Sequence, residues 1–168
     1  MKSSVHAIYF IIVLCVFTLQ AAVGQTVTNE ESTEAERSAF ITQVGMKNAA
    51  RILQLNPVPG FAATAEIVQY YEQNIAVIED YGYRNRIGLY QTGIENQAEL
   101  RLFGSRNIER IGQTGEANLF LLTSTAHEDI GLYSQTGKDN MLIIEKHDAT
   151  SVPVEIHQAG TGMQLIIK

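Results

Sequence analysis

Residues 91–140 read QTGIENQAELRLFGSRNIERIGQTGEANLFLLTSTAHEDIGLYSQTGKDN, and this stretch decides the fold. The triplet Gln-Thr-Gly begins at Gln91, Gln113 and Gln135, so successive copies lie 22 residues apart. An asparagine follows each glycine three positions later. A fixed period of this length indicates a repeat architecture, because a unit of about 20–50 residues cannot bury its apolar face alone and must stack on its neighbours.

The same pattern continues, with substitutions, on both sides of this stretch. Six units are recognisable, with successive glutamines 22–26 residues apart. The second unit has Tyr71 in place of the glycine, and the last unit has Met163 in place of the asparagine. The repeated positions are Gln43, Gly45 and Asn48; Gln69 and Asn74; Gln91, Gly93 and Asn96; Gln113, Gly115 and Asn118; Gln135, Gly137 and Asn140; and Gln158 and Gly160.

Apolar residues occupy three further positions in every unit. They lie two residues before, seven after and nine after the glutamine, as Ile111, Phe120 and Leu122 do in the fourth unit. Within each arm the inward positions alternate with a period of two, which is the period of a strand and not of a helix. We therefore expect an all-β fold over residues 37–168. It would be a β-solenoid of about six stacked strand–turn–strand rungs, with strands about 4.8 Å apart.

The recurring glutamines and asparagines predict amide ladders inside this stack. A buried amide is unfavourable unless it is hydrogen-bonded. In a column of identical amides, the carbonyl oxygen of each amide accepts a hydrogen bond from the NH₂ group of the next rung. The glycines suit turn positions with positive φ. We expect the repeated positions, together with Gln54, to join one rung to the next.

Residues 1–24 are predicted to be a cleaved signal peptide. They contain Lys2, an apolar run over residues 8–19, and the small residues Ala22 and Gly24 just before the expected cleavage site. As a helix, this run is too short to span a bilayer core of about 30 Å. A membrane anchor is the alternative interpretation.

Cleavage there would remove Cys15, the single cysteine of the sequence. The mature protein would then contain no disulfide and no thiolate metal site. Residues 25–36, which follow the predicted cleavage site, are polar and acidic and have no apolar period. Such a segment cannot bury enough apolar surface to fold, so we expect it to be disordered.

The repeat resembles that of a known family. Ser-x5-Gln-x-Gly-x-x-Asn-x-Ala-x3-Gln is the repeat of the curlins, which are the subunits of bacterial curli amyloid fibres. The resemblance covers residues 37–168 in six tandem partial copies. In the first copy every element after the serine matches, at Gln43, Gly45, Asn48, Ala50 and Gln54.

Departures from the curlin pattern occur in every unit. None of the units has the serine, whose position holds Arg37, Ala63, Asn85, Asn107, Asp129 and Val152. Phe120, Leu142 and Leu165 replace the alanine, and the last unit lacks its asparagine. Curli systems contain a minor subunit that is similar in repeat to the major one and has irregular rungs and an atypical last repeat. This protein resembles the minor subunit more than the major one.

The resemblance implies a structural protein of an extracellular fibre at the outer-membrane surface of a Gram-negative bacterium. A minor subunit would nucleate polymerisation and anchor the fibres, which serve cell adhesion and the biofilm matrix. Its partners would be other curlin subunits, a dedicated secretion channel and accessory factors, with residues 25–36 as the secretion address. The alternatives are a major fibre-forming curlin, or a soluble β-solenoid that acts as an adhesin or binding module.

The outer faces and the ends of the solenoid carry further expectations. After the last rung the sequence gives no sign of a cap, and an open strand edge is a template for another molecule. On the outer face of the second arm, the later rungs place apolar side chains where a monomer would present polar ones. These residues predict a docking surface for a fibril, a surface partner, the outer membrane or another copy: Leu119, Leu121, Met141, Ile143 and Ile166.

The composition argues against several other functions. A net charge of −6 disfavours nucleic-acid binding, which needs a basic surface. His127, His147 and His157 show neither the order of a catalytic triad nor the spacing of metal ligands. We therefore predict no enzyme activity, no metal or cofactor, and no small-molecule substrate.

Overall fold

The structure is a computed structural model that describes residues 25–29, 37–54, 63–147 and 153–168. Within these ranges the protein forms thirteen strands in two parallel sheets. The seven-stranded sheet contains, in spatial order, β1 (Gln25–Asn29), β3 (Ala49–Gln54), β5 (Ile75–Asp80), β7 (Gln97–Leu102), β9 (Leu119–Ser124), β11 (Met141–Lys146) and β13 (Gln164–Ile167). The six-stranded sheet contains β2 (Arg37–Val44), β4 (Ala63–Glu72), β6 (Arg86–Ile94), β8 (Ile108–Glu116), β10 (Ile130–Lys138) and β12 (Val154–Thr161).

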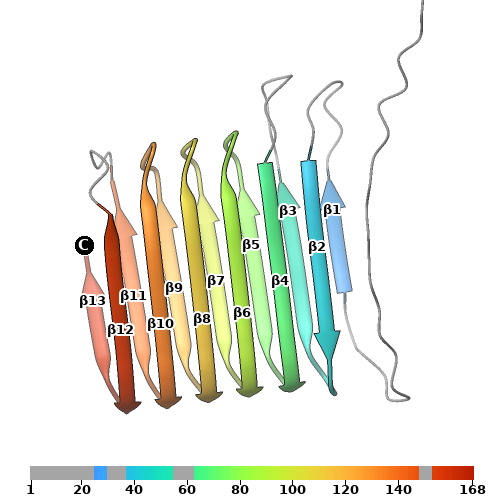
Figure 1. The fold of residues 1–168 in the computed structure, drawn as a ribbon, viewed down its shortest axis with the longest axis vertical. Coiled ribbons are helices and arrows are strands. Elements are labelled where there is room, and N and C mark those ends of the chain that lie inside the picture. Colours follow the sequence, from blue (N-terminus) through green and yellow to red (C-terminus); the bar gives the residue numbers. More distant parts are fainter. Residues whose placement is uncertain (1–24, 30–36, 55–62, 148–152) are drawn as a thin grey trace, which may run out of the picture.

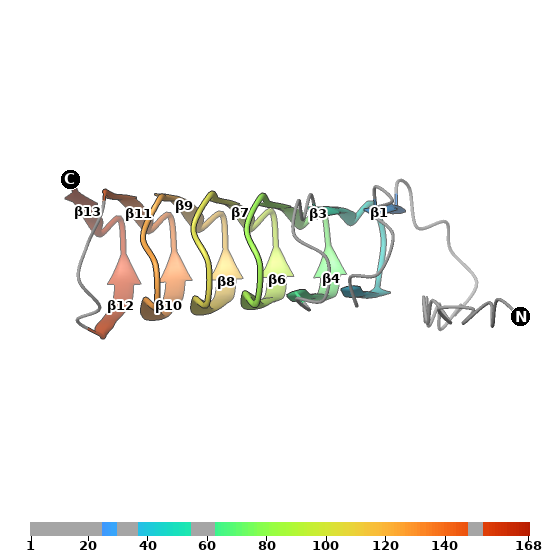
Figure 2. The same ribbon diagram turned by 90° about the horizontal axis from the view of Figure 1, so that it is seen from above.

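The two sheets face each other and the polypeptide alternates between them, so that each pair of consecutive strands from β2–β3 to β12–β13 forms one rung (Figures 1 and 2). The registers place the repeated glutamines directly opposite one another, as in the pairing of Gln91 with Gln113 and of Gln113 with Gln135. This is the parallel β-solenoid of six rungs that the period predicts, and the prediction is confirmed.

The core lies between the sheets and follows from the period-two alternation. In β9 and β11, for example, every second residue is buried. The predicted apolar columns fill this space, with Ile67, Leu100 and Phe120 completely buried. The alternation points one apolar face of each arm inward, and the opposite arm of the same rung covers that face.

The N-terminal end differs from the prediction. Residues Gln25–Asn29 form β1, which pairs in parallel with Ala50–Gln54 of β3. The prediction of disorder is therefore wrong for these five residues, because the backbone of an unpaired strand edge can be satisfied by a segment that has no apolar period. The remainder of the predicted disordered segment, residues 30–36, lies outside the described residues, as does the predicted signal peptide over residues 1–24.

The last described rung, β12 and β13, is more exposed than the inner rungs. Inward positions that are buried in the inner rungs are exposed in the last one, where Met163 is 40%, Leu165 37% and Ile167 36% exposed.

Within the described residues no helix is long and apolar enough to cross a membrane.

Candidate functional site

A continuous glutamine ladder runs along the interior of the solenoid. Each Nε2 donates to the Oε1 of the glutamine on the next rung, over N···O distances of 2.5–2.9 Å from Gln43 to Gln158. From Gln69 onward, Nε2 also donates to a backbone carbonyl of the opposite arm, such as that of Gln97 for Gln113. The ladder therefore has a direction, with donors pointing towards the C-terminal end. Its members are at most 5% exposed: Gln43, Gln69, Gln91, Gln113, Gln135 and Gln158.

The two ends of this ladder are complementary. At the N-terminal end, Gln43 Oε1 is buried and has no hydrogen-bond partner among the described residues. At the C-terminal end, Gln158 Nε2 donates to the carbonyl of Met141. The described part of the protein gives no acceptor for its second hydrogen, which in every inner rung goes to the next glutamine. Among the described residues, one end of the ladder therefore lacks a donor and the other end lacks an acceptor.

A second ladder of asparagines fixes the glycine-containing turn. The backbone N–H and the Nδ2 of each asparagine donate to Oδ1 of the preceding one, over 2.9–3.3 Å. At the last rung Met163 offers its backbone N–H alone, which donates to Asn140 Oδ1 over 3.0 Å. The ladder therefore ends one rung before the glutamine ladder does. Its members are all buried: Asn48, Asn74, Asn96, Asn118 and Asn140.

The glycines of these turns have the positive φ that their positions require. Gly93, Gly115 and Gly137 have φ between 120° and 126°. A Cβ atom at Gly115 would lie 2.0 Å from the carbonyl oxygen of Gly137 on the next rung, so no side chain fits there while φ stays near 120°. In the second rung Tyr71 takes this position with a φ of 74°. The repeat therefore tolerates one exception where the side chain is exposed.

Gln54 is buried but does not belong to a glutamine column. Its Nε2 lies 3.4 Å from Oδ2 of Asp80, the residue at the same position in the next rung. The later rungs place Leu102, Ser124 and Lys146 in this column. The structure thus joins all the predicted amide residues except Gln54 into two continuous ladders.

A third ladder, which the sequence interpretation missed, lies in the other turn. The backbone N–H of Asn107 donates to Asn85 Oδ1 over 2.9 Å, and that of Asp129 donates to Asn107 Oδ1 over 2.8 Å. All three side chains belong to residues that are at most 1% exposed. These positions stood out only as departures from the curlin serine, although their spacing of 22 residues was a signal that could have identified them.

Beside this ladder lies a buried ionisable cluster, which we define as Glu109, Asp129, Tyr133 and Lys146. Lys146 Nζ donates to Asp129 Oδ2 over 2.5 Å and lies 3.8 Å from Glu109 Oε1. It also lies 5.4 Å from the centre of the Tyr133 ring. Neither carboxylate oxygen of Glu109 has a hydrogen-bond partner within the part of the protein described here, and nor has the Tyr133 hydroxyl.

Burial makes Glu109 the unusual member of the cluster. Loss of water around its carboxyl raises its pKa from 4.5 to about 8, an effect that the positive charge of Lys146 opposes in part and the negative charge of Asp129 reinforces. Burial also raises the pKa of Tyr133. Space for Glu109 exists because the next rung has Gly131, where a Cβ atom would lie 1.9 Å from Glu109 Oε2.

The predicted docking residues share the outer face of the seven-stranded sheet. Leu121 of β9 pairs in register with Ile143 of β11, which pairs with Ile166 of β13, so that these three form one row. Leu119 and Met141 form a second row beside it. The side chains are partly exposed, and Ile166 is 54% exposed. Their shared face agrees with the prediction, and its use as a docking surface stays a prediction.

The same face is charged in the earlier rungs. Arg51 forms an ion pair with Glu79, which also lies 3.9 Å from Arg101. The hydrogen bond from Arg51 lowers the pKa of Glu79. The outer surface of this sheet therefore changes from ion-paired to apolar along the solenoid.

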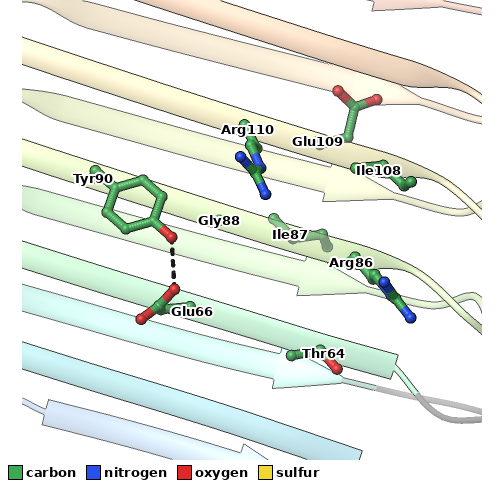
Figure 3. A pocket seen from close by; sticks show the side chains of 9 residues that line it. All are labelled: Thr64, Glu66, Arg86, Ile87, Gly88, Tyr90, Ile108, Glu109 and Arg110. Atoms are coloured by element: carbon green, nitrogen blue, oxygen red, sulfur yellow. Dashed lines mark hydrogen bonds between the residues drawn. The ribbon is translucent and has the colours of Figure 1, made fainter.

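A shallow hollow lies on the outer face of the other sheet, over Gly88 (Figure 3). Arg86, Tyr90 and Arg110 border it and are exposed. The Tyr90 hydroxyl donates to Glu66 Oε2 over 2.6 Å, and this bond raises the tyrosine pKa, so the phenol keeps its proton. Over the described ranges, no group of three or more His, Cys, Asp or Glu residues could hold a metal ion.

These features define a class of protein, the parallel β-solenoid whose rungs are joined by stacked glutamine and asparagine ladders. That class is consistent with the curlin repeat. No protein-family model, curated protein or solved structure matches the sequence or the fold significantly. The class therefore rests on this structure alone.

Proposed function

We propose that the protein is a self-assembling structural subunit of a curli-type extracellular amyloid fibre. More specifically, we propose the minor subunit, which nucleates polymerisation and holds fibres at the outer-membrane surface of a Gram-negative bacterium, for adhesion and biofilm formation. The partners are other copies, other curlin subunits, and the secretion channel with its accessory factors. The role is structural and needs no catalytic residue, metal ion, cofactor or small-molecule substrate.

The complementary ends of the glutamine ladder carry this proposal. Gln43 Oε1 lacks a donor, and Gln158 Nε2 has a hydrogen without an acceptor among the described residues. Stacking the C-terminal end of one copy on the N-terminal end of another would join these atoms and continue the ladder across the junction. An unpaired buried acceptor costs about 1–3 kcal/mol, which such a junction recovers.

The exposed last rung supports the same arrangement. Leu165 and Ile167 are in core positions yet are more than a third exposed, whereas Leu142 and Ile144 in the preceding rung are buried. A further rung would remove these side chains from water, and burial of apolar surface is the main driving force of association. The strand edge of β13 would also gain a partner.

The irregular last rung supports the minor role within this class. Met163 stands where an asparagine would continue the second ladder. A junction through this end would continue the glutamine ladder but not the asparagine ladder. It would therefore suit a single contact that nucleates or anchors a fibre better than the repeated contact of a regular homopolymer. A major fibre-forming subunit remains the nearest alternative.

A soluble adhesin or binding module is the second candidate, and one observation favours it. Strand β1 already pairs with the outer edge of β3, which covers one of the two sheet edges available for stacking at that end. A molecule in which this cover is permanent would stay monomeric.

To test this, the protein from residue 25 onward is diluted out of denaturant. Its assembly is followed by amyloid-dye fluorescence, and any product is characterised by fibre diffraction. We expect a rise in fluorescence and a cross-β spacing of about 4.7–4.8 Å. The variant Gln43→Leu should polymerise more slowly because it removes the acceptor at the junction, whereas Gln97→Leu, at an exposed position, serves as the matched control. A dye-negative monomer with a β-sheet circular dichroism spectrum would instead support the binding module.

A further inference from the structure

The N-terminal end of the solenoid is covered on one sheet and open on the other. Strand β1 is the end strand of the seven-stranded sheet, and β2 is the end strand of the six-stranded sheet. Because β2 and β3 form the first complete rung, β1 is a half rung that stands alone beyond it (Figures 1 and 2).

The C-terminal end presents a complete rung, β12 and β13. Inside the solenoid, both strands of a rung stack together: β12 pairs with β10 while β13 pairs with β11. If the β12 strand of a second copy paired with β2, the same geometry would bring that copy's β13 onto β3. The edge of β3 that it needs is the one occupied by β1.

The registers show how far the two strands would overlap. Strand β13 aligns Gln164 with Met141 and Ile167 with Ile144. Carried to the equivalent residues of β3, this register covers 49–52. Strand β1 covers Ala50–Gln54. Strand β1 and the incoming β13 would both pair with residues 50–52, so they cannot pair with β3 at the same time.

We propose that β1 is a displaceable cap, and that the β13 strand of a second copy replaces it when copies stack head to tail. The proposal rests on the self-assembly proposed above and names the contact that controls it. In a free subunit, residues 25–29 shield the edge of β3 and slow stacking. In a fibre they are released from β3 at every junction between copies.

The exchange is favourable because the incoming rung replaces a smaller contact with a larger one. Strand β1 makes five register pairs with β3. The last rung makes eight pairs through β12 and four through β13 on its own predecessor. The incoming rung also brings Gln158 to Oε1 of Gln43, for which the described residues offer no donor. The capped subunit is thus less stable than the stacked one, and release of β1 is a kinetic barrier to stacking.

The first test closes the cap covalently. Thr28 and Leu53 are register partners in the β1–β3 pair, and adjacent strands are close enough for a disulfide. The double variant Thr28→Cys/Leu53→Cys, made in the protein from residue 25 onward, contains no other cysteine. When oxidised, it should elongate fibres about tenfold more slowly than the wild type or more slowly still, and a reductant should restore the rate. The single variant Leu53→Cys is the control.

The second test opens the cap. In Val27→Pro/Thr28→Pro, two adjacent prolines remove the N–H groups of successive residues, whichever of them faces β3. Fibre formation should begin sooner and elongate several-fold faster than in the control Val27→Ala/Thr28→Ala. If the wild type polymerises and neither the disulfide nor the prolines change its rate, the cap proposal is overturned while the assembly proposal stands. If no form of the protein polymerises, opened or closed, the assembly proposal fails and the cap proposal fails with it.

Discussion

The glutamine ladder and the ionisable cluster both place polar side chains inside the same stack, but their hydrogen bonding differs. In the ladder, every inner rung contributes the same amide, and each oxygen meets a donor from its neighbour. In the cluster, two neighbouring rungs contribute different groups, and neither oxygen of Glu109 has a hydrogen-bond partner within the described residues. Identical amides on successive rungs satisfy one another throughout a stack. Where the groups differ, pairing depends on the particular neighbours: Lys146 and Asp129 are hydrogen-bonded, whereas Glu109 is not within the described residues.

Breaking the close approach of the rungs should have the largest effect on stability. In Gly115→Ala, the new Cβ would meet the carbonyl oxygen of Gly137 at 2.0 Å, with φ at 120°. We expect a loss of more than about 3 kcal/mol in the free energy of unfolding, measured by denaturant titration. Gly112→Ala, in the same strand, is the control, since its nearest neighbour lies 3.9 Å away. Equal losses in both variants would show that the close approach does not matter.

Removing one amide from the middle of the ladder should cost less. Gln113→Leu leaves Gln135 Oε1 without its donor and Gln91 Nε2 without one acceptor. The expected loss is about 2–4 kcal/mol. Gln97→Leu, at an exposed outward position, should change stability by less than about 0.5 kcal/mol. Similar changes in the free energy of unfolding for the two variants would mean that the ladder does not contribute to stability.

Replacing Glu109 with a side chain that does not titrate should remove a pH dependence of the free energy of unfolding. Its pKa is about 8 in the folded protein and near 4.5 when unfolded. Between these values the folded state holds a proton that the unfolded state has released, so stability falls as the pH rises through this window, by at most about 1.4 kcal/mol per pH unit. Glu109→Gln should remove this slope in denaturant titrations from pH 4.5 to 8. Glu155→Gln, at an exposed position, should keep it; a flat wild-type profile would contradict the prediction.

Extending the asparagine ladder by one rung should have the smallest effect. Met163→Asn would add a side-chain donor to Asn140 Oδ1, which now accepts the backbone N–H of residue 163. We expect a gain of about 0.5–1.5 kcal/mol, confined to the last rung and visible as slower hydrogen exchange in β13. Met163→Ala should give no such gain. Protection that is unchanged in the asparagine variant would mean that the last rung does not hold the side chain in place.

The repeat could be predicted from the sequence because its signals are local and redundant. The strand alternation, the turn glycine and the amide positions can be recognised within a single rung, and six rungs repeat them with few exceptions. The fold, the inward columns and the two predicted ladders follow from that redundancy. The third ladder was equally periodic, but Asn85, Asn107 and Asp129 were interpreted only as departures from a family pattern.

The remaining features depend on partners that the sequence does not place next to them. Strand β1 has no apolar period, and its pairing with β3 exists only because the solenoid leaves an edge open there. Glu109 lies buried beside Lys146 because Gly131 on the next rung leaves room for its carboxyl. The amino-acid sequence by itself determined the rung and its repetition, since both rest on side-chain periodicity within a strand. Only the tertiary structure decided what happens at the ends and at the irregular positions, because there the free energy depends on which groups the stacked rungs bring into contact.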